Sequence, residues 1–291
     1  MDYKDQTAFV TGGASGIARA LTQRLIDGGA RIFIADINLD AAQSFVDEIN
    51  QQRPDTAFCT KCDVNSWDEL TSAFSKAIEI FDRVDYVFPI AGLTERQVIP
   101  KPSEQQDVKK HGFVKPDLAV FDTNATGMIN LVLIAVQAFR RQEKREELGG
   151  MRGKIVCVSS TCGLYAIYGV PIYTASKQAM VGITRTYGVL LPSEGVTLNA
   201  ICPHVVKTAI SKHTPWWYDD LEKRGLLTDI GQIVAGFEEY LGKSTRSAEC
   251  LECGPEGRRV VEFIDYMGEK TKLGCEAVIE RSARTSLWQD Q

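Results

Sequence analysis

The sequence of 291 residues has no long uninterrupted apolar run. Its longest nearly apolar stretch, Met128 to Val136, contains Asn130 and is much shorter than the roughly 20 residues that a membrane-spanning helix needs. The first residues, Met1 to Asp5, lack the cationic region and apolar stretch of a targeting signal. We therefore expect no membrane span and a cytoplasmic location.

Basic residues are too few and too scattered to form a nucleic-acid surface. Lys and Arg number 33 against 38 Asp and Glu, which gives a formal charge of −5. Because affinity for a phosphate backbone depends on clustered Lys and Arg, no nucleic-acid partner is expected. Internal repeats of solenoid length and low-complexity segments are also missing from the sequence. With 44% hydrophobic residues, the chain is long enough for one large packed domain.

The eight cysteines include two Cys-x-x-Cys pairs, Cys59 with Cys62 and Cys250 with Cys253. Four thiolates at such spacings can hold a zinc ion. The first pair, however, lies in a segment with the composition of a strand, where residues three apart face opposite sides. We therefore favour reduced, half-buried thiols and no metal, and keep a zinc-binding interaction module as a distant alternative.

Short apolar runs rich in β-branched residues alternate with segments of helical periodicity. The predicted strands are 7–10, 31–35, 58–60, 86–88, 154–158 and 197–201. The predicted helices are 16–28, 40–52, 66–81, 118–142, 174–191 and 229–241. This alternation is typical of a mostly parallel sheet covered by helices on both faces. The sequence therefore predicts a doubly wound α/β fold.

Three segments interrupt this plan. Residues 93–117 are polar and contain three prolines, which predicts a long surface loop after the fourth strand, where it could add a wall to a ligand pocket. The charged run 140–147 predicts a solvated helix end. Residues 208–247 predict a substrate lid, and residues 248–291 a C-terminal strand and tail.

A glycine-rich turn follows the first predicted strand. Gly12 and Gly16 let the chain turn sharply into a helix, whose free N–H groups near Ser15 and Ile17 can bind a pyrophosphate. Asp36 ends the next strand at the interval where a carboxylate accepts hydrogen bonds from an adenosine ribose. No Arg follows this acid to neutralise a 2′-phosphate, so the pattern favours NAD over NADP.

A second motif places a phenol, an ammonium group and a hydroxyl together. Tyr173 and Lys177 are four residues apart in a predicted helix and therefore share one face. A nearby cation favours the phenolate and lowers the pKa of the tyrosine. Such a tyrosine can act as general acid or base for an alcohol/ketone couple, and Ser160, at the end of a strand, could hold the substrate oxygen.

Together these motifs resemble the short-chain dehydrogenase/reductase family, whose members have a single Rossmann domain of about this size; the similarity covers about residues 5–210. Within the family, residues 171–177 and 198–203 look most similar to the NAD-dependent 15-hydroxyprostaglandin dehydrogenase branch. The resemblance implies one domain spanning 1–291 and a homodimer or homotetramer. It implies a catalytic tetrad of Asn124, Ser160, Tyr173 and Lys177. It implies cofactor contacts from Gly12, Ser15, Gly16, Ile17, Asp36, Asp63, Val64, Ala91, Gly92, Tyr173, Lys177, Pro203, Val206 and Thr208.

In this resemblance each tetrad member has a role. Tyr173 is the acid/base and Ser160 orients the substrate oxygen. Lys177 binds the nicotinamide ribose and lowers the pKa of the tyrosine. Asn124 holds a water that relays protons from the lysine to solvent.

The segment after the last predicted strand indicates the substrate. Trp216 and Trp217 lie where the family builds its lid, and large flat side chains suit a bulky apolar ligand. His204 stands where the family has a glycine and is a further candidate substrate contact, although a solvent-facing or packed imidazole is the more common explanation of a lone histidine. We therefore expect a lipid-like or polycyclic alcohol or ketone.

Two further departures from the family pattern concern the cofactor. Ala18 replaces the third glycine of the fingerprint, and Pro89 and Ile90 replace two asparagines after the fourth strand.

From all these motifs the chain is predicted to be an NAD-dependent oxidoreductase. The alternatives are an NADPH-dependent carbonyl reductase and a dinucleotide-binding protein without redox activity.

Overall fold

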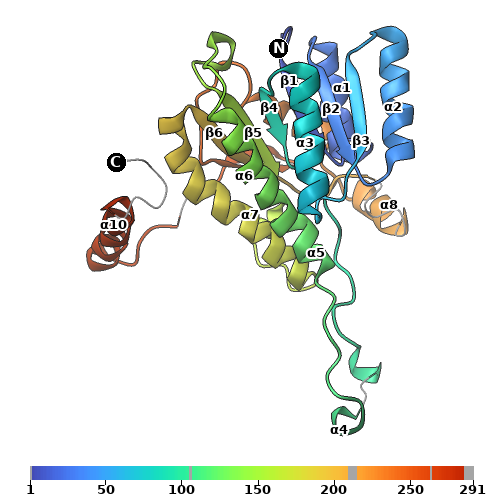
Figure 1. The fold of residues 1–291 in the computed structure, drawn as a ribbon. Coiled ribbons are helices and arrows are strands. Elements are labelled where there is room, and N and C mark those ends of the chain that lie inside the picture. Colours follow the sequence, from blue (N-terminus) through green and yellow to red (C-terminus); the bar gives the residue numbers. More distant parts are fainter. Residues whose placement is uncertain (1, 105–106, 209–214, 263, 285–291) are drawn as a thin grey trace. The chain divides into compact units, whose positions relative to one another are not determined.

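The computed structural model describes residues 2–104, 107–208, 215–262 and 264–284 (Figure 1). The chain forms two compact units, Met1–Val260 and Val261–Gln291. Part of the predicted lid, 209–214, and the end of the predicted tail, 285–291, lie outside the described residues.

The first unit is built on one eight-stranded sheet with the order β3-β2-β1-β4-β5-β6-β7-β8. Neighbouring strands are parallel except β7 and β8, which are antiparallel. The strands are β1 (Thr7–Thr11), β2 (Arg31–Asp36), β3 (Ala57–Lys61), β4 (Tyr86–Phe88), β5 (Gly153–Val158), β6 (Val196–Pro203), β7 (Cys250–Gly254) and β8 (Gly257–Val260). All six predicted strands are present, and the predicted α/β fold with a mostly parallel sheet is confirmed.

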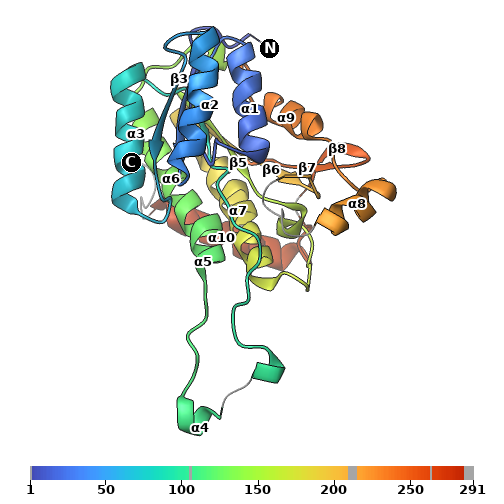
Figure 2. The ribbon, with the colours of Figure 1, turned by 90° about the vertical axis from the view of Figure 1, so that its right-hand side faces the viewer.

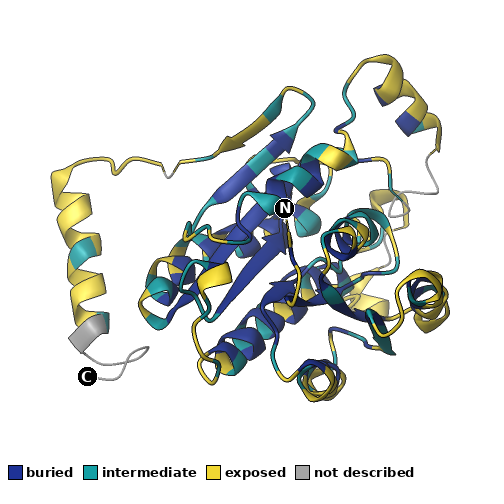
Figure 3. Ribbon diagram, turned by 90° about the horizontal axis from the view of Figure 1, so that it is seen from above, coloured by how far each residue is buried: buried dark blue, intermediate teal, exposed yellow. Residues whose placement is uncertain are grey.

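Helices cover both faces of the sheet (Figures 1 and 2). One face carries α1 (Gly16–Asp27), α2 (Leu39–Gln52) and α9 (Ile230–Glu238). The other face carries α3 (Trp67–Phe81), α6 (Met128–Phe139) and α7 (Pro171–Leu190). Successive residues of a strand point to opposite faces, so Phe9 packs in the core under α3 and α6 while Val10 packs under α1 and α9. Strands buried on both faces explain the continuous apolar runs of the sequence (Figure 3).

The helical stretch Ala119–Phe139 is longer than the apolar run counted in the sequence. It comprises α5 (Ala119–Phe121), a π-helical turn η2 (Asp122–Gly127) and α6. By length and composition alone it could cross a membrane, but 61% of its most apolar window is buried inside the protein. Residues such as Leu131 and Phe139 are fully buried, which is the environment of a core helix.

Further helical elements lie in the loop 93–117, in the predicted lid and in the second unit. The predicted loop 93–117 contains the short elements η1 (Pro102–Glu104) and α4 (Val108–His111). The predicted lid contains α8 (Pro215–Lys223). In the second unit, the predicted tail forms a helix, α10 (Glu269–Arg284).

The sheet order also decides the zinc alternative. Cys59 lies in β3, with Cys62 just beyond it, whereas Cys250 and Cys253 lie in β7. Five strands separate β3 from β7, so six strand spacings lie between them, roughly 29 Å in all. The two pairs therefore cannot share one ion.

Candidate functional site

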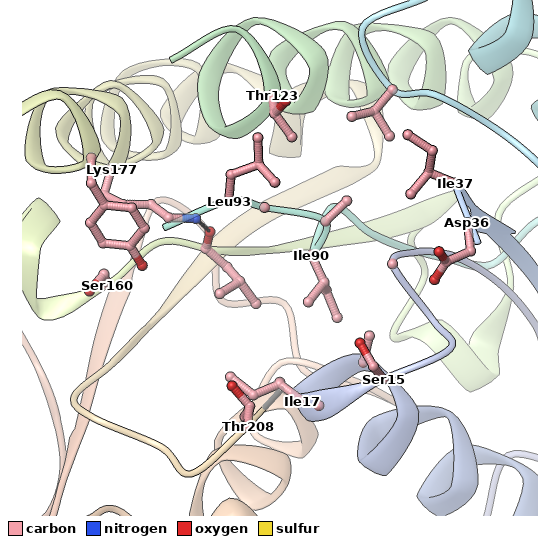
Figure 4. A pocket seen from close by; sticks show the side chains of 18 of the residues that line it. Ser15, Ile17, Asp36, Ile37, Ile90, Leu93, Thr123, Ser160, Lys177 and Thr208 are labelled. Carbon is pink, nitrogen blue, oxygen red and sulfur yellow. Dashed lines mark hydrogen bonds between the residues drawn. The ribbon is translucent and has the colours of Figure 1, made fainter. Parts of the chain in front are cut away.

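A pocket of about 600 Å³ opens at the carboxyl ends of the parallel strands. In open α/β sheets ligands bind at this edge. Its wall includes all fourteen residues predicted to contact the cofactor, together with Ser160 and His204. Figure 4 shows Ser160 and Lys177 at one end of the pocket and Asp36 and Ser15 at the other, with Ile90 and Leu93 between them.

The glycine turn between β1 and α1 leaves room for a ligand against the backbone. Gly12 has a φ of +71°, and a Cβ there would lie 3.0 Å from the Cα of Ala91, so a side chain would be strained and crowded. Ser15 is the N-cap of α1, but its side chain makes no cap hydrogen bond. The first N–H groups of the helix are therefore free to meet an anion such as a diphosphate.

Asp36 is held rigidly at the end of β2. Its side-chain oxygens accept hydrogen bonds from the backbone N–H groups of Ala14 (3.0 Å) and Asn38 (2.9 Å), and the residue is buried. Each carboxylate oxygen has more than one lone pair, so the group can still accept bonds from ribose hydroxyls. It also presents a negative charge to anything bound beside it.

Asp63 lies two residues beyond the end of β3, where its side chain caps a turn. Its Oδ1 accepts hydrogen bonds from the backbone N–H of Asn65 (2.9 Å) and from the side-chain amide of Asn65 (3.0 Å). Asp63 and the buried Val64 nevertheless both line the pocket. The turn-capping role and a contact with a ligand are therefore compatible.

Pro89 ends β4 without breaking the sheet. The strand stops at Phe88, and the proline carbonyl accepts a hydrogen bond from the N–H of Val158. The N–H groups of Ile90 and Ala91 lie 3.1 and 3.3 Å from the Thr11 hydroxyl oxygen, which accepts from them. Thr11 thus holds this segment, where the family pattern would have placed asparagine amides.

Tyr173 and Ser160 form the reactive end of the pocket. Burial raises the pKa of Tyr173 to about 12, and a hydrogen bond with the Ser160 side chain acts in the opposite direction. The Ser160 hydroxyl oxygen also accepts from the N–H of Cys162 at 3.2 Å. The two hydroxyl groups are thus placed to share one substrate oxygen.

Lys177 lies beneath the tyrosine ring, with its Nζ 5.6 Å from the ring centroid. Its ammonium donates to the carbonyl of Val158 at 3.1 Å, and burial lowers its pKa to about 8. The expected lowering of the Tyr173 pKa is not found in this structure, because burial of the phenol is the largest influence on it and raises it. A lysine that titrates near neutrality is nevertheless suited to pass a proton.

Asn124 stands behind the pocket wall rather than on it. Its side-chain oxygen accepts from the N–H of Leu93 (2.7 Å), and its amide donates to the Leu93 carbonyl (2.9 Å). A Cβ on Gly92 would lie 3.0 Å from the Asn124 oxygen and 3.7 Å from the Lys177 ammonium. The missing side chain at this glycine therefore leaves a small space that both groups border.

The three residues predicted to contact the substrate differ in whether they line the pocket. His204 is exposed and lines the pocket together with Tyr173. Trp216 lies on α8 with 68% of its surface exposed, and neither it nor Trp217 is part of the pocket wall. A substrate role for all three residues stays a prediction.

Glu95 is a site residue that the sequence did not reveal. Helix α7 begins at Pro171, which has no N–H, and its N-cap Val170 makes no side-chain cap. The Glu95 carboxylate instead accepts from the N–H groups of Ile172 (3.3 Å) and Tyr173 (2.6 Å). Glu95 thus caps the N-terminus of α7 from a loop that is distant in the sequence. No local sequence pattern could have predicted this contact.

Arg96, the next residue, is a second one. It lines the pocket and places a guanidinium there. Its only sequence signal was its position in the loop that follows the fourth strand.

Comparison with known proteins agrees with this geometry. The sequence profile of the short chain dehydrogenases matches residues 6–219. Among curated proteins, the chain is 30% identical over 213 residues to 15-hydroxyprostaglandin dehydrogenase, NAD(+), of Homo sapiens, covering 72% of this chain and 71% of that protein. It is 30% identical over 205 residues to 3beta-hydroxysteroid dehydrogenase 2 of Eggerthella lenta, covering 70% and 72%.

Solved structures have the same fold. A short-chain type dehydrogenase/reductase from Mycobacterium marinum matches with a TM-score of 0.71 at 19% identity, covering 87% of this chain and 95% of that one. Levodione reductase matches with a TM-score of 0.69 at 22% identity, covering 87% and 97%.

Proposed function

The chain belongs to the short-chain dehydrogenase family, and from this membership we propose that it is an NAD-dependent dehydrogenase of bulky hydrophobic secondary alcohols. The family comprises oxidoreductases that use NAD or NADP. One observation carries the proposal: Tyr173, Ser160 and Lys177 line the same pocket as the glycine turn of α1.

The residues at the far end of the pocket fit a dinucleotide. The uncapped start of α1 would hold the diphosphate, and the Asp36 carboxylate would accept from the adenosine ribose. Ile37, which follows this acid, brings no positive charge and is 64% exposed. A 2′-phosphate would thus meet like charge, which supports NAD as the cofactor.

The chain's own residues would move the proton of the reaction. When bound, the nicotinamide supplies the acceptor or donor of the hydride. In the oxidative direction the Tyr173 phenolate accepts the proton of the substrate hydroxyl while the Ser160 hydroxyl donates to the same oxygen. Lys177 stabilises the phenolate and passes the proton toward the space at Gly92, which Asn124 also borders.

A bulky apolar substrate is supported by two lines of reasoning. Two of the similar proteins are named for hydroxyprostaglandin and hydroxysteroid substrates. Apolar side chains, including Leu93 and Ile90, also line the middle of the pocket (Figure 4). His204 and the lid tryptophans are then the proposed substrate contacts.

One observation favours a second candidate function, an NADPH-dependent carbonyl reductase. Arg96 puts a guanidinium on the pocket wall, and such a group could pair with an extra phosphate. The loop that carries it follows β4, however, whereas the adenosine ribose is expected beside the end of β2. We therefore rank this candidate second.

Location and assembly complete the proposal. All eight cysteines are free thiols, which supports a reducing, cytoplasmic compartment. We further propose a homodimer or homotetramer formed through the outer faces of α6 and α7, where Val189 is 64% exposed.

The test replaces Tyr173 by Phe, which removes one hydroxyl and keeps the ring. The variant should lose at least about a hundredfold in kcat with NAD⁺ and a hydrophobic secondary alcohol, while its Kd for NADH stays unchanged. Tyr266→Phe, the same change at a half-exposed tyrosine that does not line the pocket, is the matched control and should keep wild-type turnover. Equal turnover of the Tyr173→Phe variant and the wild type would sink the proposal.

A further inference from the structure

The loop 93–117 forms an arm that leaves the fold. Figures 1 and 2 show it extending from the carboxyl edge of the sheet to α4 and back. The two limbs touch near the base, where the N–H of Asp117 donates to the carbonyl of Val98 at 3.1 Å. Every described residue from Lys101 to Leu118 is exposed. The outer arm thus adds nothing to the core.

The arm nevertheless carries large apolar side chains. Phe113 is 91% exposed, Ile99 62%, Val114 51% and Val108 48%. Single exposed apolar residues are common on protein surfaces, but several together on one projecting segment indicate an interaction site. Any partner of the arm must therefore offer an apolar environment in which these side chains can be buried.

Positive charge accompanies the apolar side chains. The lysines of the arm are Lys101, Lys109, Lys110 and Lys115. Residues 108–115 include three of them and no acid, although the whole chain has a formal charge of −5. The acids that flank this stretch accept hydrogen bonds from backbone groups: Asp107 accepts from the N–H of Lys109 and Asp117 from the N–H of Ala119. Glu104, farther along the arm, accepts from Gln97 and from the N–H of Lys101. Lys110 Nζ lies 4.0 Å from the Asp107 carboxylate, whereas Lys101, Lys109 and Lys115 form no ion pair among the described residues. Most of the positive charge of the arm can therefore meet an external anion.

An anionic lipid bilayer provides both the apolar phase and the negative charge. Segments that bind such surfaces bury apolar side chains at the level of the headgroups and place lysines against the phosphates. A protein partner fits less well, because the cores of protein interfaces are depleted in lysine. We propose that the tip of the arm, residues 108–115, docks on the surface of an anionic membrane.

Docking by this tip would hold the protein with its pocket edge toward the lipid. The arm begins at Leu93, which lines the pocket, and the pocket opens at the carboxyl ends of the strands. The proposal concerns binding to a surface and does not depend on which alcohol is oxidised. It can therefore be tested without a substrate.

The experiment is co-sedimentation of the full-length protein with vesicles of phosphatidylcholine alone and of phosphatidylcholine mixed with phosphatidylserine. Wild type should bind the mixed vesicles, release them as salt is raised, and bind the neutral vesicles weakly or not at all. Lys109→Gln with Lys110→Gln should weaken this binding roughly tenfold or more. Phe113→Ser with Val114→Ser should weaken it by a similar factor.

The control variant removes the same charge elsewhere. Lys4→Gln with Lys243→Gln neutralises two exposed lysines before β1 and after α9 and should bind vesicles as the wild type does. Both arm variants should keep the wild-type Kd for NADH, which shows that they are folded. Failure of wild type to bind the mixed vesicles, or equal binding by the arm variants, overturns the proposal. A change of oligomeric mass in the arm variants with unchanged vesicle binding overturns it in favour of a contact between copies of the chain.

Discussion

Glu95→Ala should destabilise the first turn of α7, which carries Tyr173. Two N–H groups at the start of α7, those of Ile172 and Tyr173, would lose their acceptor. Losing an N-cap costs about 0.5–2 kcal/mol, and losing a negative charge at a helix start costs a further 0.3–1 kcal/mol or so. The first turn, which carries Tyr173, should therefore be destabilised by about 1–3 kcal/mol.

This energy sets the expected size of the effect on turnover. Each 1.4 kcal/mol or so corresponds to a tenfold change in rate, so kcat should fall about 5- to 150-fold if the ordered turn is required in the transition state. The melting temperature should fall by about 2–4 °C for each kcal/mol in a domain of this size. Glu95→Gln keeps one acceptor oxygen and should recover part of kcat.

The assay compares kcat with the Kd for NADH in the same variants. Most predicted cofactor contacts, including the glycine turn and Asp36, lie away from the start of α7, so Glu95→Ala should raise this Kd by a much smaller factor than it lowers kcat. Glu104→Gln is the matched control, since Glu104 is an exposed acid of the same loop, and it should behave as the wild type. A Glu95→Ala protein with wild-type kcat, or with kcat and Kd changed in parallel, would refute the reasoning.

Two further predictions test charges, one in the pocket and one buried near the start of β5. Asp36→Asn should lower the ratio of the NADPH dissociation constant to the NADH dissociation constant by about tenfold or more. The reason is that two like charges some 4 Å apart repel by roughly 1 kcal/mol in bulk water and roughly 4 kcal/mol near a protein surface. An unchanged ratio in fluorescence titrations would contradict this prediction. Lys154 is fully buried, and burial lowers its pKa from 10.5 to about 8. Between these two pH values the side chain takes up a proton when the protein unfolds. The free-energy cost of burying the ammonium is therefore complete below pH 8 and gone above about pH 10.5. Lys154→Met should therefore increase the free energy of unfolding by about 3 kcal/mol more near pH 7 than near pH 10.5. Urea titrations at both pH values measure this difference. An increase that is the same at both pH values would show that the burial cost of the ammonium is not its source.

Much of the fold could be predicted from the sequence because its signals are local. Apolar runs such as 154–158 are buried on both faces, and the alternation with helices permits few arrangements other than a parallel sheet. The final hairpin and α10 gave weaker signals. Cys250–Gly254 is short, and the strand after it, Gly257–Val260, is largely exposed. A half-exposed edge lacks the apolar pattern of a central strand.

Residues of the candidate site could be predicted where the local backbone or the bound group requires one particular residue type. Gly12 is required by a positive φ and a close backbone approach, and Asp36 by the end of its strand. Contacts between distant segments were not predictable in this way. Glu95 caps a helix that begins 76 residues later in the chain, and burial is the largest cause of the raised pKa of Tyr173. Both effects arise only when the folded chain brings the segments together.

The most direct test of the account is the titration of the purified wild-type protein with NADH and, separately, with NADPH, following nicotinamide fluorescence. The account predicts binding of NADH at least about tenfold tighter than binding of NADPH, because the buried Asp36 carboxylate opposes a 2′-phosphate. Tighter binding of NADPH would contradict the assignment of NAD, and binding of neither would contradict the pocket as a dinucleotide site.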